Sequence, residues 1–309
     1  MTDEFPTDAI DVTLRYVAAL LACGFIIVGV KKWLPMAEAR RAVLVSLWPR
    51  FAVWVLAAFL FLSGTGFGLL LLGAALAVLG WQAAREVAAV ARSAALAADG
   101  RLSSIAAAAI VLAALVAGGR GLTGALIVAL LGAAAAGIVR TREDSAATFA
   151  AIAGKVFSIL YVAVPLGLLV LLRGRADGFA TVAWLLLVVI LTDLLGTLGD
   201  LVFGRAPVTP RLLPGRSVAG LIAAFVGALL GGILMHGAIL GAPLALFVLG
   251  SLFVGAAVVL GDALAAALKR SANVATFGRA LAASGGVMDR IGGLLVAAPV
   301  AYGIVALMH

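Results

Sequence analysis

Residues 179–200 read FATVAWLLLVVILTDLLGTLGD, an apolar run interrupted by a few hydroxyl side chains and two carboxylates. The run is long enough to cross the hydrocarbon core of a bilayer as one α-helix, which takes about 20 apolar residues. Its carboxylates, Asp193 and Asp200, both lie in its second half. The stretch therefore predicts a membrane-spanning helix that carries two acidic groups toward one end.

The composition extends this prediction to the whole chain. Of 309 residues, 65% are hydrophobic and 12% are charged, whereas soluble domains have about half apolar and a quarter charged residues. This excludes a water-soluble globular protein and leaves no room for a soluble domain. The fold class predicted is all-α, a polytopic integral membrane protein with about ten transmembrane helices.

Apolar runs place the expected helices. Their approximate ranges are 13–30, 50–62, 66–84, 103–118, 122–139, 153–172, 179–200, 218–238, 242–265 and 291–308. Most of the 22 Lys and Arg residues lie in alternate connections, those after the first, third, fifth, seventh and ninth helices. By the positive-inside rule these connections face the cytoplasm and both termini face outward. We expect an integral protein of a bacterial-type inner membrane.

Carboxylates at the hydrocarbon boundary are costly and indicate a functional site by default. Asp193, Asp200, Asp262 and Asp289 lie in or beside apolar helices of the second half. For Asp200 the simpler explanation is an ion pair with Arg205 at a helix end. Because carboxylate oxygens are hard ligands that suit Mg²⁺, the group as a whole predicts a magnesium site at the cytoplasmic face.

Cationic and glycine residues surround these carboxylates in sequence. Arg and Lys match phosphate oxygens, and glycine lets a backbone approach a phosphate closely. The residues concerned are Lys269, Arg270, Arg279, Gly285, Gly286, Arg290 and the Pro214–Gly215–Arg216–Ser217 segment. Together with the acids they predict a metal-dependent phosphate site. The simpler explanation is that the cations only orient the chain in the membrane.

Two stretches carry a more specific pattern. The first comprises Asp193, Phe203–Gly204–Arg205, Pro210–Arg211, Pro214–Gly215–Arg216–Ser217 and Gly220. The second comprises Gly261–Asp262, Leu268–Lys269–Arg270, Gly278–Arg279, Gly285–Gly286 and Asp289–Arg290–Ile291. In order and spacing they resemble the two cytoplasmic motifs of the phosphatidate cytidylyltransferase (CDP-diacylglycerol synthase) family, over about residues 185–305.

Several positions depart from the family pattern. Ala275 and Thr276 stand where the family has Lys-Asp, Ser284 where it has His, and Gly292 where it has Asp. Ala219 replaces a Glu. Leu213 replaces a Ser, Ala282 a Pro and Thr197 a Tyr, and the milder differences are Arg216 for Lys and Ser217 for Thr. The severe changes each remove a charge or a hydrogen-bonding group from the expected site, so the chain is identified as a divergent member.

The resemblance implies condensation of CTP with phosphatidic acid, or a related lipid phosphate, to CDP-diacylglycerol and pyrophosphate in phospholipid biosynthesis. It divides the chain into residues 1–150, a helical scaffold, and residues 151–309, a cytidylyltransferase-like region. The expected partners are CTP, the lipid phosphate and the bilayer, with no nucleic acid and with a homodimer left open.

We assign the expected roles residue by residue. The Mg²⁺ ligands are Asp262 and Asp289, with Asp193 as a supporting carboxylate. The catalytic phosphate contacts are Lys269, Arg270 and Arg290. The residues that hold the triphosphate or the lipid head group are Arg216, Ser217, Gly285 and Gly286.

Four alternatives stand beside this interpretation. A non-catalytic relative would keep the fold and bind lipid or protein, and the replacements at Ala219, Ala275, Ser284 and Gly292 favour it. An intramembrane aspartyl protease is suggested by Gly199–Asp200 and Gly261–Asp262 but lacks the first glycine of its motif. Asp177–Gly178 suggests a CDP-alcohol phosphotransferase without the residues that should follow. A transporter would place its charges at the midplane.

Overall fold

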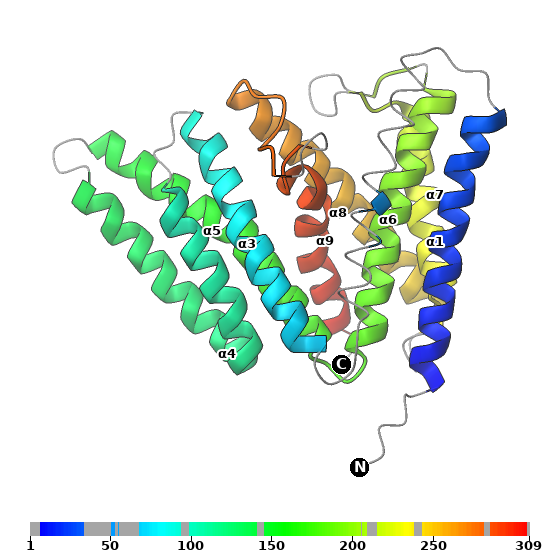
Figure 1. The fold of residues 1–309 in the computed structure, drawn as a ribbon, viewed down its shortest axis with the longest axis horizontal. Coiled ribbons are helices and arrows are strands. Elements are labelled where there is room, and N and C mark those ends of the chain that lie inside the picture. The colour runs from blue at the N-terminus through cyan, green and yellow to red at the C-terminus, as the bar shows by residue number, and fades with distance from the viewer. Residues whose placement is uncertain are drawn as a thin grey trace. The chain divides into compact units, whose positions relative to one another are not determined.

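The computed structural model describes most of the chain, and all of the elements that it describes are helices. The described residues are 7–33, 51–52, 55, 68–93, 99–140, 145–204, 206–208, 215–237, 243–280 and 285–307. The helices are α1 (Thr7–Trp33), α3 (Gly68–Ser93), α4 (Gly100–Arg140), α5 (Ser145–Arg173), α6 (Gly178–Phe203), α7 (Val218–Leu234), α8 (Leu244–Ser271) and α9 (Met288–Ala306). Figure 1 shows their course.

Seven of the described helices are long and apolar enough to cross a membrane, and α7 is a shorter apolar helix. The predicted class, an all-α polytopic integral membrane protein, is confirmed. The count of about ten crossings is not confirmed, and the expected helix at 50–62 lies almost entirely outside the described residues. Lipid-facing side chains account for the many exposed apolar residues, such as Phe25, Val128 and Leu249, because the bilayer replaces water around them.

The expected helices 103–118 and 122–139 correspond to two arms of α4. Ala117 and Gly118 leave helical geometry, with φ −123° and ψ 15° at the first and φ 58° and ψ −141° at the second. A positive φ of this size favours glycine, which has no Cβ to clash. Figure 1 shows the chain turning back at this bend.

The chain divides into two compact units. The first contains Met1–Ser63, Arg175–Asp262 and Val300–His309, and the second contains Gly64–Gly174 and Ala263–Pro299. Helices α8 and α9 therefore contribute to both. The predicted division at residue 150 concerned likeness to a family rather than packing, and it stays a prediction.

In the first unit α6 is the central helix, with most of its residues buried. Helix α7 packs closely on it through glycines, because a Cβ at Gly227 would strike the backbone of Leu191 and a Cβ at Gly231 would meet Val188. Small residues are the usual means of close helix contact in lipid. Trp184 of α6 also donates a hydrogen bond of 2.9 Å to Ser251 of α8.

In the second unit α3, α4 and α5 pack against one another. A Cβ at Gly73 would press on Leu115, and one at Gly167 on Leu122, so that both glycines again mark close approaches. The second half of α3 is almost wholly buried on one side and contains a buried carboxylate, Glu86.

Candidate functional site

The end of α6 carries the first polar cluster. Asp193 and Asp200 are seven residues apart, about two helical turns, and so share one face of α6. The loop after α6 returns through an antiparallel bridge between Pro207 and Ser217. Val208 donates to the carbonyl of Arg216 at 3.2 Å. This bridge fixes Arg216 at the start of α7, beside the end of α6.

Arg216 is the centre of this cluster, which we call the Arg216 cluster: Asp193, Asp200, Arg216, Ser217 and Asp262. Its Nη1 donates to Asp200 Oδ2 at 3.2 Å, and its Nη2 donates to Asp262 Oδ2 at 2.9 Å. Nη2 also lies 3.8 Å from Asp193 Oδ1. One guanidinium thus joins carboxylates from α6 and α8.

The Arg216 side chain is 13% exposed. Burial acts to lower its pKa, but the three carboxylates around it raise that pKa above its ordinary value. The guanidinium is therefore a permanent counter-charge for the three acids.

Ser217 caps α7 and joins the helix to the same cluster. Its hydroxyl accepts a hydrogen bond from Gly220 N at 3.0 Å, as N-cap residues usually do. Asp200 Oδ1 accepts from both the amide and the hydroxyl of Ser217, at 2.7 and 2.8 Å. A Cβ at Gly220 would fall on the Asp200 carboxylate, so the glycine makes room for this contact.

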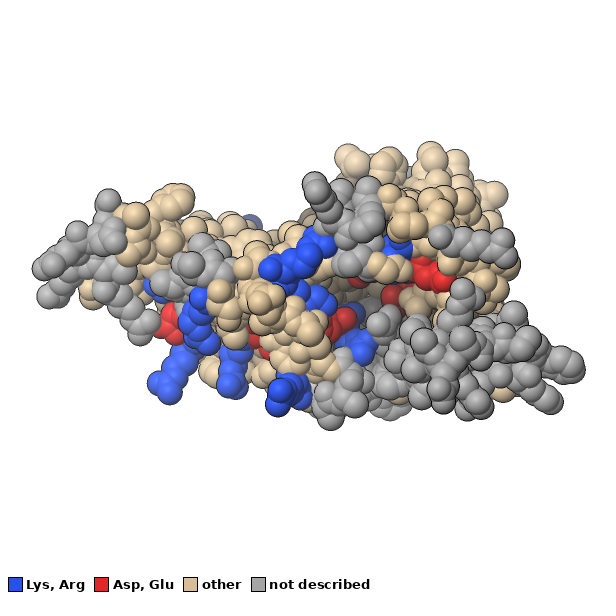
Figure 2. Space-filling model, turned by 90° about the horizontal axis from the view of Figure 1, so that it is seen from above, with Lys and Arg blue, Asp and Glu red and all other residues tan. Residues whose placement is uncertain are grey.

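Figure 2 shows the molecule from the end at which α6 finishes, with acidic atoms lying against basic ones. Asp200 was expected to pair with Arg205, which lies outside the described residues, and its observed cationic partner is Arg216. The Ser217 hydroxyl, predicted to contact substrate, already has two partners within the chain.

A second polar cluster lies in the other unit, between the last turn of α8 and the first turn of α9. We call it the Asp289 cluster: Lys269, Phe277, Gly286 and Asp289. Asp289 Oδ1 accepts from Lys269 Nζ at 2.9 Å, and Oδ2 accepts from the amides of Phe277 and Gly286 at 3.0 and 2.9 Å. Both carboxylate oxygens thus fix the segment between α8 and α9.

Gly285 and Gly286 fit closely around this carboxylate. Gly285 has φ +88°, which favours glycine, and a Cβ there would lie 2.8 Å from Asp289. A Cβ at Gly286 would collide with Glu86 Oε2. The glycine pair therefore has a structural role in addition to the substrate contact predicted for it, which stays a prediction.

Glu86 of α3 is the residue that sequence reasoning missed. It is 4% exposed, accepts from the amide of Met288 at 2.9 Å and accepts from Gln82 Nε2 at 3.0 Å. The expected helix at 66–84 ends before Glu86, whereas α3 continues to Ser93 and contains it. The only signal in the sequence was a single Glu, next to Arg85, in a run of alanines and valines at 83–91.

The remaining predicted residues lie near these clusters in the chain. Arg270 is exposed at the end of α8, and Arg290 is half-buried in the first turn of α9. Of the positions that differ from the family pattern, Ser284 lies outside the described residues, Gly292 is buried, and Ala275 and Thr276 are exposed. The catalytic roles of Lys269, Arg270 and Arg290 stay predictions.

The donor set suits magnesium chemically, because the clusters offer several hard carboxylate oxygens. Within the part of the chain that is described, however, no group of three or more His, Cys, Asp or Glu residues is arranged to hold a metal ion. In the Arg216 cluster the guanidinium lies among the carboxylates, with the Asp262 side chain the most exposed at 37%. Asp262 and Asp289 belong to different units, so a shared ion stays a prediction.

The known proteins that this chain resembles are cytidylyltransferases. A profile described as "Cytidylyltransferase family" matches residues 48–308. Phosphatidate cytidylyltransferase of Mycobacterium leprae (strain TN) is 30% identical over 132 residues, which is 43% of this chain and 42% of that protein. Those of Brucella abortus biovar 1 (strain 9-941) and Mycobacterium tuberculosis (strain ATCC 25618 / H37Rv) are each 30% identical over 43% of this chain, covering 49% and 40% of their own lengths. The chain thus matches less than half the length of these relatives.

Proposed function

Because the chain belongs to the cytidylyltransferase family, we propose that it is a phosphatidate cytidylyltransferase. The reaction joins CTP and phosphatidic acid to give CDP-diacylglycerol and pyrophosphate in phospholipid biosynthesis. A phosphate oxygen of the lipid forms a bond to the α-phosphorus of CTP, the bond from that phosphorus to the bridging oxygen breaks, and pyrophosphate leaves. The proposed setting is a bacterial-type inner membrane with both motif loops facing the cytoplasm.

The observation that carries the proposal is the ordered arrangement of the motif residues. Arg216 is held by three carboxylates, and Lys269 is held by Asp289. Charges that served only to orient helices in the membrane would have no need of such networks. Fixed cations beside a bilayer suit a reaction between two phosphate compounds, one of which keeps its acyl chains in lipid.

The chain's own residues supply charge and position rather than a strong base. A phosphate monoester is mostly ionised at neutral pH because its second pKa is about 6, so the lipid oxygen is already a nucleophile. Catalysis then depends on neutralising phosphate charge and aligning the two groups. Lys269 Nζ carries three N–H groups and donates one of them in a hydrogen bond to Asp289. The other two can donate to a phosphate while Asp289 holds the ammonium group in place.

Magnesium is part of the proposal. Asp193 and Asp262 would hold the ion, and the bound ion would neutralise charge on the phosphates. Asp289 is the further ligand in this proposal, and both of its oxygens also accept hydrogen bonds within the chain.

The test is CTP-dependent turnover in membranes that contain the protein. Asp289→Asn should abolish formation of CDP-diacylglycerol from labelled CTP and phosphatidic acid, because it removes the charge that holds Lys269. Asp177→Asn is the matched control, since Asp177 precedes α6 at the end opposite Asp200. If Asp289→Asn turns over at the wild-type rate, the assignment of Asp289 to the site is wrong. If the wild-type protein shows no turnover, the proposed reaction is refuted.

A non-catalytic relative that binds lipid or protein is the second candidate. The observation in its favour is that Asp289, Ser217 and Arg216 are all engaged with other groups of the chain. This candidate predicts binding of phosphatidic acid without consumption of CTP, and the same assay separates the two.

A further inference from the structure

A cavity of about 590 Å³ lies in the second unit and shares Phe277 with the Asp289 cluster. The second half of α3, the first turn of α4 and the segment Phe277–Gly278 line it. Its volume falls within the range of about 300–1,000 Å³ that small-molecule sites occupy. Most of its lining comes from residues 82–101, which neither motif includes.

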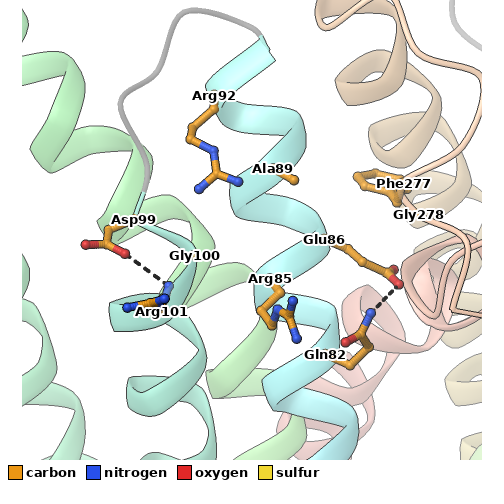
Figure 3. A pocket seen from close by; sticks show the side chains of 10 residues that line it. All are labelled: Gln82, Arg85, Glu86, Ala89, Arg92, Asp99, Gly100, Arg101, Phe277 and Gly278. Carbon is orange, nitrogen blue, oxygen red and sulfur yellow. Dashed lines mark hydrogen bonds between the residues drawn. The ribbon is translucent and has the colours of Figure 1, made fainter.

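Three arginines, Arg85, Arg92 and Arg101, line this cavity, and we call it the arginine pocket. Figure 3 shows Arg92 extending from α3 toward the start of α4. A Cβ on Gly100 would lie 3.5 Å from Arg92 Nη1, which places that guanidinium over the first turn of α4. Cations from two helices thus surround one hollow.

The lining also has two acids, Glu86 and Asp99, against the three arginines, so cations outnumber acids in it. Glu86 accepts from Gln82 and from the amide of Met288. Asp99 caps α4 by accepting from the amide of Arg101 at 3.0 Å. Among the described residues, no carboxylate forms an ion pair with the side chain of Arg85, Arg92 or Arg101.

The chemistry of such a pocket favours phosphate. A guanidinium presents a planar set of donors that matches phosphate oxygens in pairs, and it is charged at every accessible pH. All of the cations in this lining are arginines, and none is a lysine. A ligand that carries several phosphate oxygens could accept from all three side chains at once.

The wall of the pocket is continuous with the Asp289 cluster. Phe277 lines the pocket and donates its amide to Asp289. Glu86 lines the pocket and accepts from Met288, the residue before Asp289. A ligand in the pocket would therefore lie against the segment that holds Asp289 and Lys269.

We propose that the arginine pocket binds the phosphate groups of a substrate, and that α3 and α4 thereby take part in substrate binding. The proposal rests on the proposed function for the identity of its ligands, which are CTP and phosphatidic acid. The phosphate could come from the nucleotide or from the lipid head group, and the experiment distinguishes these sources.

The experiment measures binding to the full-length purified protein by isothermal titration calorimetry. The probes are CTP, pyrophosphate, dihexanoyl phosphatidic acid and dihexanoyl phosphatidylglycerol. The variants are the triple change Arg85→Gln, Arg92→Gln and Arg101→Gln, and the corresponding triple change to Lys. Arg120→Gln is the matched control, because it removes the same charge from α4 near the bend, away from the pocket.

The Gln triple variant should bind either CTP or phosphatidic acid about a thousandfold more weakly, since each of the three charge-assisted hydrogen bonds contributes about a factor of ten. The Lys triple variant should recover part of this loss, and Arg120→Gln should bind as the wild type does. Loss for CTP and pyrophosphate assigns the pocket to the triphosphate, and loss for phosphatidic acid assigns it to the lipid head group. If the triple variant does not purify in one monodisperse peak, Arg85→Gln and Arg101→Gln each replace it, with an expected tenfold loss.

Unchanged affinity for both CTP and phosphatidic acid would overturn the proposal. Equal losses for phosphatidic acid and phosphatidylglycerol would overturn it as well, because the arginines would then serve a general anionic surface. Turnover measured on the same preparations separates this proposal from the proposed reaction. If the wild-type protein forms CDP-diacylglycerol and the variants bind CTP and phosphatidic acid as the wild type does, only the pocket proposal is refuted. If the variants lose binding selectively but the wild-type protein forms no CDP-diacylglycerol, only the proposed reaction is refuted.

Discussion

Replacing Arg216 by Gln should destabilise the protein by leaving three acids without their counter-charge. The guanidinium lies 2.9 Å from Asp262, 3.2 Å from Asp200 and 3.8 Å from Asp193. Gln is shorter than Arg and carries no charge, so it cannot replace the three contacts of the guanidinium. The remaining carboxylates would then repel one another at the ends of α6 and α8.

The size of this effect follows from burial. Removing one partner of a buried ion pair costs about 3–5 kcal/mol, and an exposed pair contributes about 0–1 kcal/mol. The charged side chains of the Arg216 cluster are from 13% to 37% exposed, so we expect a loss of about 2–3 kcal/mol. At about 2–4 °C per kcal/mol for chains of 150–250 residues, the apparent melting temperature should fall by about 4–12 °C.

The assay is thermal unfolding of the detergent-purified protein, followed by tryptophan fluorescence at a fixed scan rate. The decisive measurement is the added change Asp262→Asn. In the wild-type background it removes an ion pair and should lower the melting temperature, whereas in Arg216→Gln it relieves repulsion and should raise it. Arg120→Gln, an exposed arginine elsewhere, should melt as the wild type does. If Asp262→Asn acts in the same direction in both backgrounds, Arg216 is not the counter-charge that organises this cluster.

Three further predictions follow from the same structure. Glu86→Leu leaves the amide of Met288 without its acceptor and should cost about 1–3 kcal/mol in thermal unfolding, while Glu86→Gln should cost less; equal effects would contradict the role of the acceptor. Gly220→Ala places a Cβ on the Asp200 carboxylate and should destabilise by about 1–3 kcal/mol, whereas Gly124→Ala, which meets nothing within 4 Å, should be neutral or better. Chelation by EDTA should reduce CTP-dependent turnover to background and added Mg²⁺ should restore it; full turnover in EDTA would exclude the metal.

The fold class could be predicted from sequence because a bilayer permits few solutions. Backbone groups in lipid must be paired within the segment, so long apolar runs form helices, and the range 179–200 lies within α6 almost end to end. The bend in α4 could be anticipated from glycines at 118 and 119, which interrupt an otherwise apolar run. Local composition was sufficient in each case.

The partners of the polar residues could not be predicted in the same way. Asp200 has an arginine five residues later in the sequence, yet the structure pairs it with Arg216, because the bridge between Pro207 and Ser217 brings the end of the loop back to α6. The spacing of a charge from its neighbours along the chain says little once a loop reverses direction. The order of the motif residues in the sequence was sufficient to identify them. Their contacts could be seen only in the folded structure.

Glu86 connects α3 to the start of α9 by a hydrogen bond. A glutamate at the end of an apolar helix is usually explained by the nearby membrane surface, where a charge costs little. Here the carboxylate is buried and accepts the amide of Met288, one of the first amides of α9, which has no partner within its own helix. A buried carboxylate without hydrogen bonds would cost several kcal/mol, so α3 and the segment before α9 stabilise each other. The position of Asp289 therefore depends on a residue more than 200 positions earlier. Any change in α3 that moves Glu86 should also shift Asp289 and its ion pair with Lys269.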